Sequence, residues 1–473
     1  SRFTCEFELV AELLCIYLKN FKCFAIFFQN PPFNMYKTKQ MEDMKMRKSK
    51  LLAVLTATTM AMTMAVPMVM PADITGTTVM AEEKVTEGRC GDSATYSYDT
   101  DTKTLTINGT GEMWDDTGFA KSLGDTKTIV INKGITSIGS SSFCDLYRVE
   151  KVEIADTVST IKSEAFNEIN GTFVVPASVT KVETNAIRWA KKIVVQGDMK
   201  NYAYAALGNG ADEIEVGGTA DSLGYALAGV YEYDDFSVTI SKNNTACKIS
   251  NGCLMSADGK TVYYYVSGKN KVTIPDAVIT IKPAAFYQKN IKDVTLGKNV
   301  KTIGEYAFYN SYVSKIITNS NLKTIGRCAF ARTKLKEATL KSSVAIKPAA
   351  FESKVKIYST KSLKKSKTVV TSAKITNKKV SVKFCKLAGA KGYQVQIKKG
   401  SKVYKYFTTK NSFNVKTPKA LKGTYNVKFS YDLGKYTAKV EGKPAYVTVR
   451  PYKELKNKKK SYGKWSEKMI LSK

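Results

Sequence analysis

The chain has 473 residues, 43% of them hydrophobic and none of them histidine, and its 74 Lys and Arg against 41 Asp and Glu give a formal net charge of +33. Without histidine the chain cannot form a Ser-His or Cys-His nucleophile pair, a Cys₂His₂ zinc site or a zinc-metalloprotease motif. Its length allows two or three domains, each with its own hydrophobic core.

The positive charge is concentrated in the last quarter of the chain. Lys361–Lys473 carries 31 basic and 4 acidic residues, a net charge of +27, whereas Glu82–Thr360 carries 34 basic and 31 acidic residues, a net charge of +3. Such an asymmetry between segments indicates a polyanionic partner for the C-terminal one.

The start of the chain has the pattern of a targeting segment. A basic region (Lys45 to Lys50) precedes an apolar run (Leu51 to Met70) and a small-residue cleavage site (Val79-Met80-Ala81). We therefore predict a secretory signal peptide at 46–81, with 1–45 as upstream sequence translated from a misplaced start. The alternative is an uncleaved membrane anchor, because the apolar run is nearly long enough to span a bilayer.

Six cysteines follow the predicted leader, and they are widely scattered. The sequence contains no CxxC motif, and so no strong zinc or thioredoxin signal. Cys247 and Cys253 are close enough in the chain for a local disulfide. Cys144 and Cys328 lie beside core positions of the repeat described next, and we expect them to be buried free thiols.

One motif, aliphatic-x-x-Ile-x-x-x-Ala-Phe, recurs through the middle of the chain. The last residues of adjacent copies lie 21 to 23 positions apart, a regularity that predicts a repeat architecture. Four clear copies end at Phe166, Phe286, Phe308 and Phe330, and weaker copies end at Phe143, Ile187 and Phe351.

Short alternating segments such as Val152-Glu-Ile154 and Val294-Thr-Leu296 lie between the copies and predict short strands with one face inward. Each repeat thus supplies a strand, a turn and a tight Ala-Phe segment, and stacked repeats bury a continuous core. We expect each Phe to be a core residue whose burial contributes about 1.5–3 kcal/mol. The predicted solenoid spans 121–358, and its pattern weakens between Ala190 and Tyr233, with faint echoes near Leu207 and Leu227.

These repeats resemble the BspA-like leucine-rich-repeat bacterial surface proteins. Residues 251–266, with Asp258-Gly259 as a two-residue turn, resemble the hairpin inserted in that family. The segment 82–120, with Cys90-Gly-Asp-Ser-Ala and Leu105-Thr-Ile107, resembles the small β-module that often precedes the repeats. The resemblance implies an exported protein whose solenoid binds host or bacterial surface proteins or glycans, with no catalytic residues.

The composition changes after the repeats. Residues 359–372 are rich in Lys, Ser and Thr, which predicts a linker. Alternating runs in 373–473, such as Val380-Ser-Val382 and Tyr393-Gln-Val395, predict an antiparallel β-sandwich. Ala390 to Gln396 and Tyr462 to Ser466 resemble strands of a fibronectin type III domain. The stretch from Ser430 to Pro444 is too long for that pattern and leaves two candidates for one strand.

The basic residues of the C-terminal segment are 30 Lys and one Arg, Arg450. Strand alternation predicts outward positions for Lys383, Gln394, Gln396 and Lys428. A surface dominated by Lys favours diffuse attraction to a polyanion over sequence-specific base reading, so we expect an anionic cell-wall polymer as partner and no nucleic acid. The alternative is a basic domain whose charge only confers solubility.

Other motifs in the sequence give weak signals for chemistry. Three Ser-x-x-Lys matches, at Ser159-Lys162, Ser178-Lys181 and Ser320-Lys323, all fall within the repeats, where chance matches multiply. We expect Asp99-Thr-Asp101 to be a hairpin turn, and Asp115-Asp116 and Asp234-Asp235 to be solvated turns. The run Tyr263-Tyr264-Tyr265 should divide between core and surface if it forms a strand.

The sequence therefore predicts a mainly β protein: a leucine-rich-repeat solenoid of short strands and 3₁₀ turns, followed by an antiparallel β-sandwich. We expect an exported surface protein for binding or adhesion and not an enzyme. It should have no catalytic, cofactor-binding or metal-binding residues and no permanent membrane span after signal cleavage, and its ligand-binding residues cannot be named from sequence. Two alternatives stay open: a glycan hydrolase that uses paired carboxylates, and a purely structural spacer.

Overall fold

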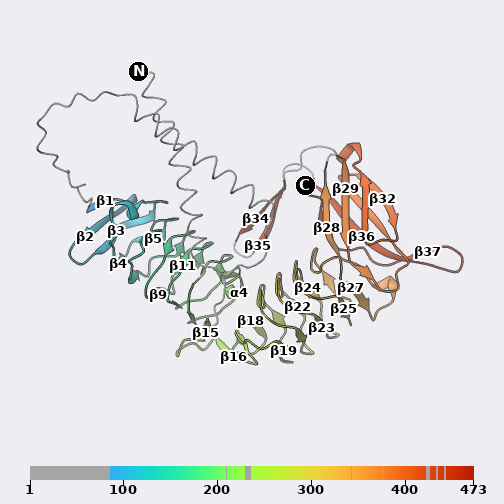
Figure 1. Ribbon diagram of the computed structural model, residues 1–473, viewed down its shortest axis with the longest axis horizontal. Helices are drawn as coiled ribbons and strands as arrows, with labels where there is room; N and C mark the ends of the chain where they lie inside the picture. Colours follow the sequence, from blue (N-terminus) through green and yellow to red (C-terminus); the bar gives the residue numbers. More distant parts are fainter. Residues whose placement is uncertain are drawn as a thin grey trace, which may run out of the picture. The chain divides into compact units, whose positions relative to one another are not determined.

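The computed structural model describes residues 86–208, 210–228, 236–341, 343–376, 378–421, 427–432, 435–440 and 444–472 (Figure 1). The predicted leader 1–45, the predicted signal peptide 46–81 and the pair Asp234-Asp235 lie outside these residues. Glu82–Lys473 forms one compact unit. Within the described ranges, no helix is both long and apolar enough to cross a membrane.

The unit begins with an antiparallel meander of three strands: β1 (Glu87–Arg89), β2 (Gly91–Asp99) and β3 (Thr104–Met113). Strand β3 also pairs in parallel with β4 (Thr128–Ile131) and with β5 (Ile135–Ile138). The helix α3 (Phe119–Ser122) lies between β3 and β4 in the chain. The N-terminal meander is therefore hydrogen-bonded directly to the first turn of the solenoid.

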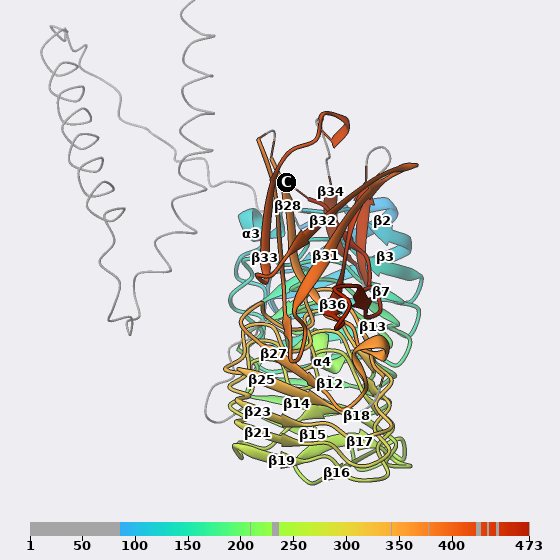
Figure 2. The same ribbon diagram turned by 90° about the vertical axis from the view of Figure 1, so that its right-hand side faces the viewer.

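The solenoid contains two rows of parallel strands, because most repeats contribute one strand to each row (Figure 2). In the second half of the solenoid, Val294 of one repeat pairs with Ile316 of the next, and Thr302 pairs with Thr324. The first row comprises β4, β6 (Lys151–Ile154), β9 (Thr172–Val175), β12 (Lys192–Val195), β14 (Glu213–Val216), β15 (Ser237–Ile240), β19 (Lys271–Thr273), β21 (Asp293–Thr295), β23 (Lys315–Ile317), β25 (Glu337–Leu340) and β27 (Lys356–Ser359). The second row comprises β5, β7 (Thr160–Ile161), β10 (Lys181–Val182), β13 (Asn201–Tyr202), β18 (Thr261–Tyr265), β20 (Thr280–Ile281), β22 (Thr302–Ile303), β24 (Thr324–Ile325) and β26 (Ala345–Ile346).

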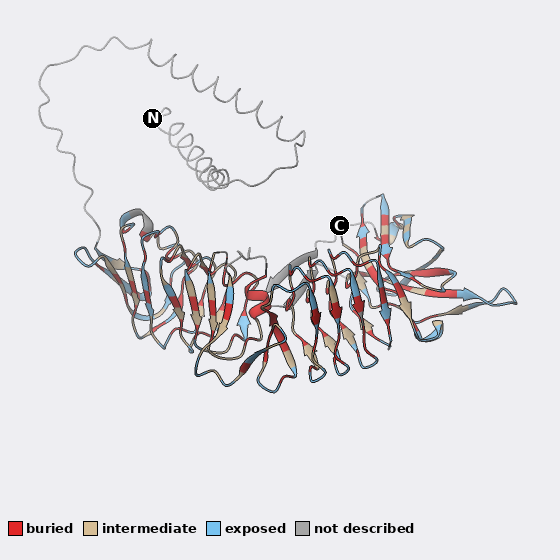
Figure 3. Cartoon of the chain, turned by 60° about the horizontal axis from the view of Figure 1, so that its bottom comes forward, coloured by how far each residue is buried: buried red, intermediate tan, exposed pale blue. Residues whose placement is uncertain are grey.

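The Ala-Phe segments form the core that the repeat pattern predicts, which confirms that assignment. Phe286, Phe308 and Phe330 are fully buried, and their ring centroids stack at 4.7 Å and 5.0 Å. The first half has the same stacking, with Phe143 and Phe166 at 5.1 Å. Figure 3 shows that the buried residues of the solenoid lie mainly in its strands and the exposed residues mainly in the turns that connect them. Backbone bonds add to this contact, since the amide of Phe308 donates to the carbonyl of Ala329 over 2.8 Å.

The Ala-Phe segments that end at Phe166, Phe286, Phe308 and Phe330 each lie between two residues with left-handed backbone. One stands two positions before the aromatic residue, as Glu164 does (φ 56°), and the other stands two positions after it, as Gln288 does (φ 58°). L-residues enter this region at a cost of about 1–2 kcal/mol, so the inter-repeat contacts must hold the turn in place. The same geometry recurs at Ala284, Tyr306, Cys328, Asn310 and Arg332.

Between Ala190 and Tyr233 the sequence pattern decays, yet both rows of strands continue through β12, β13 and β14. Leu207 and Leu227 are buried at the places that Phe occupies elsewhere, and the amide of Leu207 donates to the carbonyl of Ala226 over 3.1 Å. The short helix α4 (Leu223–Ala226) replaces the usual turn there. In the preceding repeats the turn itself forms a small parallel pair, β8 (Phe166–Asn167) with β11 (Ile187–Arg188).

The inserted hairpin consists of β16 (Cys247–Ser250), β17 (Cys253–Ser256) and β18, all antiparallel. The turn from β16 to β17 is Asn251-Gly252, where both φ angles are positive (50° and 73°). Asp258-Gly259 lies in the turn from β17 to β18, as predicted, but this connection has four residues and not two. Asp258 accepts hydrogen bonds there from the Ser256 hydroxyl and the Lys260 amide.

The tyrosines of β18 do not divide between core and surface, which corrects that expectation. Tyr263, Tyr264 and Tyr265 are exposed by 6%, 2% and 2%. Tyr263 and Tyr264 pack in the core of the first half of the solenoid, and Tyr265 packs in the core of the second half. Strand β18 lies where the two cores meet, so both of its faces are covered.

The C-terminal part forms two antiparallel sheets. One contains β28 (Val370–Ile375), β29 (Lys379–Phe384) and β33 (Ser412–Lys416), and the other contains β31 (Gly392–Lys399), β32 (Lys402–Thr408), β36 (Ala445–Glu454), β37 (Lys460–Tyr462) and β38 (Met469–Ile470). The rings of Phe384 and Tyr393 meet between the sheets at 4.7 Å. The predicted fold class, a repeat solenoid followed by an antiparallel sandwich, is confirmed.

The long stretch before Pro444 has its own structure. Strands β34 (Val427–Asp432) and β35 (Lys435–Val440) pair only with each other among the described residues, whereas β36 pairs with β31 along its length. The strand that belongs to the sandwich is therefore β36. The 3₁₀ turn η3 (Lys419–Leu421) precedes the hairpin.

The solenoid and the sandwich are joined by direct contacts. Strand β30 (Lys386–Leu387) pairs in parallel with the last solenoid strand, β27. The Asn411 side-chain amide donates to the carbonyl of Ser353 over 2.9 Å. The segment 359–372, expected as a linker, contains the 3₁₀ turn η2 (Leu363–Lys365) and the buried Val369 and Val370. Residues of both parts share one continuous apolar core.

Candidate binding site on the solenoid

A cavity of about 660 Å³ lies beside the turns that follow the buried Phe residues in the second half of the solenoid. Its walls include Tyr264, Tyr287 and Tyr312 together with Lys289, Arg332 and Lys334. No Asp or Glu is among the described residues that line it. The described walls are therefore aromatic and cationic, and the volume is within the size range of sites that bind small molecules.

The repeat spacing explains why these side chains gather here. Gln288, Asn310 and Arg332 occupy the same left-handed position in three successive repeats, 22 residues apart. Asn290, Tyr312 and Lys334 form a second such row, also at intervals of 22 residues. Since parallel strands lie about 4.8 Å apart, each row presents one polar or aromatic group at each step along the solenoid.

A cluster of tyrosines lies against the cavity wall. Tyr287 stacks on Tyr309 with ring centroids 5.3 Å apart, and its hydroxyl lies 3.3 Å from that of Tyr204. Tyr306 contacts Tyr309 edge-on at 5.4 Å. Burial, followed by the bond to Tyr204, raises the pKa of Tyr287 far above its ordinary value, so this wall stays neutral at physiological pH.

The three cations are held next to aromatic rings. The Lys289 side chain is buried, with 8% exposure, and its ammonium lies 4.2 Å from the centre of the Tyr264 ring. The exposed Arg332 and Lys334 lie 5.6 Å from the Tyr309 ring and 5.8 Å from the Tyr312 ring. These are the distances of weak cation–π attraction, which orients the charged groups.

The acidic residue next along the solenoid, Glu352, is engaged elsewhere. It accepts a 3.0 Å hydrogen bond from the backbone amide of Arg332 and forms a 2.7 Å ion pair with Lys354. The Arg332 guanidinium is not part of that pair. The positive charge at the edge of the cavity is thus retained.

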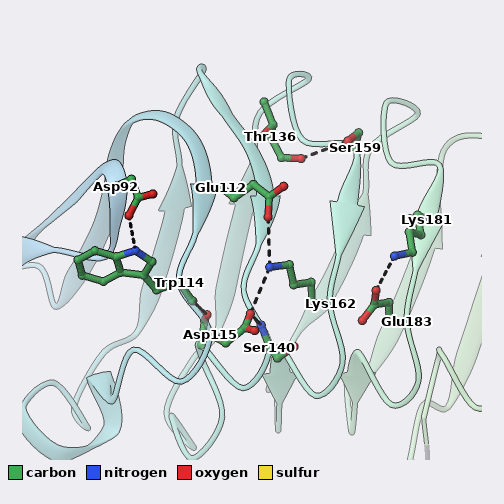
Figure 4. A network of polar contacts seen from close by, with 11 residues as sticks. Asp92, Glu112, Trp114, Asp115, Thr136, Ser140, Ser159, Lys162, Lys181 and Glu183 are labelled. Carbon is green, nitrogen blue, oxygen red and sulfur yellow. Dashed lines mark hydrogen bonds and ion pairs between the residues drawn. The ribbon is translucent and has the colours of Figure 1, made fainter.

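A second polar network, near the N-terminal meander, bears on the hydrolase alternative (Figure 4). Lys162 lies between Glu112 and Asp115, with its ammonium 3.3 Å from an oxygen of each. The backbone amide of Ser140 and then Lys162 lower the pKa of Asp115. A carboxylate held in its charged form suits an ion pair between strands and not a general acid.

The Ser-x-x-Lys matches do not assemble a nucleophile among the described contacts. The hydroxyl of Ser159 donates to the carbonyl of Thr136 over 3.2 Å, while Lys162 faces the two carboxylates (Figure 4). Lys181 is paired with Glu183 at 2.6 Å. Asp99 accepts the backbone amides of Asp101 and Thr102, which confirms the predicted turn. No group of residues able to hold a metal ion occurs in the described ranges.

All six cysteines of the described chain are free. Cys247 pairs across the hairpin with Ser256, and Cys253 pairs with Ser250, so the possible disulfide between the two cysteines is absent. Burial raises the pKa of the Cys253 thiol to about 12. Cys144 and Cys328 are free, as expected, but half-buried rather than fully buried. None of these thiols has the lowered pKa of a reactive cysteine.

The arginine of the basic segment is a structural residue of the sandwich. The Arg450 guanidinium lies 3.9 Å from the Tyr462 ring and 4.5 Å from the Trp465 ring. Gln394, predicted to face outward, is only 5% exposed because Arg450 covers it. Lys383 is exposed as predicted and Gln396 is half-buried; the side chain of Lys428 lies outside the described residues. The exposed positive charge of the sandwich therefore comes from lysine.

Comparison with known proteins agrees with this architecture. Residues 92–194 and 259–378 match the model of the BspA type leucine rich repeat region, in six copies. These two segments are therefore similar to the BspA type leucine rich repeat region. No curated protein sequence is significantly similar to the chain.

Several solved structures are similar to it. A leucine-rich repeat protein from Eubacterium ventriosum is 20% identical, with 57% of this chain and 88% of that one covered and a TM-score of 0.34. The pneumococcal vaccine antigen PcpA is 14% identical, with 57% and 93% covered and a TM-score of 0.32. A leucine rich cell surface protein from Faecalibacterium prausnitzii is 16% identical, with 57% and 87% covered and a TM-score of 0.33.

The cavity residues could not be named from the sequence. The repeat motif marks the buried Ala-Phe positions, whereas Tyr312, Arg332 and Lys334 occupy variable positions between motifs. One signal was present in the sequence: Asn290, Tyr312 and Lys334 share one position of the repeat. Aligning the repeats on their Phe residues and reading each exposed column would have selected them.

Proposed function

We propose that the protein is an exported, non-catalytic surface protein that binds a ligand through the cavity of its solenoid. The observation that carries this proposal is that two rows of repeat positions line one cavity of about 660 Å³. One row is Asn290, Tyr312 and Lys334, and the other is Gln288, Asn310 and Arg332. A repeat protein presents variable side chains on a rigid stack, and such surfaces serve recognition.

The proposed organisation has three parts. A β-module at 82–120 begins the solenoid of 121–358, and a basic domain of 373–473 follows. The sheet of three strands (β28, β29, β33) packed on the sheet around β31 and β36 supports a fibronectin type III-like assignment for that domain. We place retention at the cell envelope in this domain, since its net charge of +23 comes almost entirely from lysine.

Cell fractionation with a salt wash and N-terminal sequencing tests this function. We expect the protein in the wall fraction, starting at Glu82, and released by about 1 M salt, where charge contacts are screened beyond about 3 Å. Retention in molar salt would exclude charge-based attachment. Recovery from the cytosol with residues 46–81 intact would exclude the surface function.

One observation favours the hydrolase alternative. Burial and the neighbouring charge of Asp145 raise the pKa of Glu168, with Arg188 acting in the opposite direction. Asp145 and Glu168 occupy the same left-handed position in successive repeats, and a raised carboxyl pKa is a property of general acids. Release of reducing sugar from envelope glycan by the protein, abolished in Glu168→Gln, would establish this alternative.

A further inference from the structure

We infer that the cavity binds an acidic saccharide, with a sugar carboxylate held at Arg332 and Lys334. This inference rests on the proposed binding function and names its ligand class. It follows from the charge of the cavity, from its polar groups and from the backbone around it.

The positive charge at one edge of the cavity favours anionic ligands. Arg332 and Lys334 line this edge, and Glu352, the acidic residue next along the solenoid, is bonded to Lys354 and to a backbone amide. The planar guanidinium of Arg332 matches the two oxygens of a carboxylate, and such paired bonds are shorter and stronger than neutral ones.

The remaining groups suit a hydroxyl-rich ring. The amides of Gln288, Asn290 and Asn310 line the cavity and can both donate and accept hydrogen bonds. Tyr312 is 51% exposed and offers an aromatic face on which the apolar side of a sugar ring can lie. Because the repeats place these groups at steps of about 4.8 Å, successive units of a chain meet equivalent groups.

The backbone around the cavity argues against an extended peptide. Peptides commonly bind by adding a strand to a sheet edge, which requires unpaired backbone groups. Here the amide of Gln288 donates to the carbonyl of Tyr309 over 2.9 Å, and that of Asn310 donates to the carbonyl of Ala331 over 3.0 Å. These backbone groups are already used between repeats, so side chains must provide the recognition.

Calorimetric titration with two matched probes tests the inference: an oligogalacturonate and the same oligosaccharide with its carboxylates methyl-esterified. We expect the acidic form to bind at least about tenfold more tightly, because a charge-assisted bond is lost on esterification. Arg332→Gln and Lys334→Gln should each weaken binding of the acidic form by about tenfold or more, and Tyr312→Ala should weaken both forms.

The control is Lys323→Gln, which removes the same charge from an exposed side chain of the neighbouring repeat outside the cavity lining. It should leave affinity unchanged, and all four variants should keep the wild-type unfolding temperature, since the altered side chains are exposed. Equal affinity for the two probes, or an equal loss in Lys323→Gln, would overturn the inference.

Two further results would each overturn the inference. Binding of a polyglutamate peptide in place of the oligosaccharide, lost in Arg332→Gln, would overturn the sugar class. Absence of binding to either saccharide, in a protein that salt still releases from the wall, would overturn this inference and leave the proposed surface function standing.

Discussion

The Nε atom of Arg450 donates a 2.8 Å hydrogen bond to Oε1 of Gln394, a side chain that is almost completely buried on the neighbouring strand. The bond fixes the guanidinium where it lies between Tyr462 and Trp465. Within a segment rich in exposed lysine, this arginine thus stabilises the sandwich.

Arg450→Lys tests that role, because it keeps the charge but removes the planar group. We expect the free energy of unfolding to fall by about 2 kcal/mol, since the variant loses stacking on two rings and a charged hydrogen bond to a buried amide. Urea unfolding followed by tryptophan fluorescence measures this loss. Lys453→Arg, an exposed exchange on the same strand, should change nothing; an equally stable Arg450→Lys would contradict the assignment.

Phe308→Ala should cost about 3–5 kcal/mol, because the lost ring lies between two others and leaves a cavity in the stack. The rings of Phe286 and Phe330 are 4.7 Å and 5.0 Å away. The urea midpoint should fall accordingly. Tyr312→Ala, which removes a half-exposed ring outside the stack, should stay within about 0.5 kcal/mol of wild type; similar losses in both variants would argue against the stacked core.

Glu164 tests the left-handed turn. Its φ is 56°, a conformation open to glycine but costly for β-branched residues. Glu164→Gly should keep the free energy of unfolding within about 0.5 kcal/mol, while Glu164→Val should lower it by about 1–2 kcal/mol. Thermal unfolding of the two variants side by side provides the comparison, and a valine variant as stable as the glycine variant would refute the turn geometry.

Asp198 should make the solenoid sensitive to acid. Its bond to Lys200, with the backbone amide of Thr219, lowers the pKa of Asp198 to about 2. A folded-state pKa below the unfolded one stabilises the fold at neutral pH, and this contribution is lost as pH falls from about 4 towards 2. Urea midpoints measured across that range should fall less steeply in Asp198→Asn than in wild type; parallel curves would rule out the contribution.

Much of the fold could be predicted from the sequence, because the repeat places the same residue types at the same structural positions. Phe286, Phe308 and Phe330 are core residues regardless of which residues occupy the variable surface positions. The residues indicated a turn at Asp258-Gly259, but not the additional strand β16 or the second turn at Asn251-Gly252. Both pairs suit tight turns, and the structure has a strand connection at each.

Two kinds of error have a common physical origin. Strand alternation assigns Gln394 and one face of Tyr263-Tyr264-Tyr265 to a surface, yet Arg450 covers Gln394 and a junction of two cores encloses the tyrosines. The alternation pattern distinguishes the two faces of one strand, but it cannot predict which side chains from distant parts of the chain cover those faces. The cavity could not be predicted for a related reason. Its residues share a position around the solenoid, and the repeat motif, which marks only buried positions, does not specify the residues there.

The pairing of β30 with β27 has a mechanical consequence. If the sandwich is fixed to a wall and the cavity holds a ligand on another surface, tension passes along the stack, through hydrogen bonds that lie parallel to the pull. These bonds are loaded in series, so repeats can detach singly from the junction. Each one releases a segment of about 22 residues, or roughly 75 Å of extended chain. Under flow the protein would therefore lengthen in steps, while the sandwich stayed on the wall and the cavity kept its ligand.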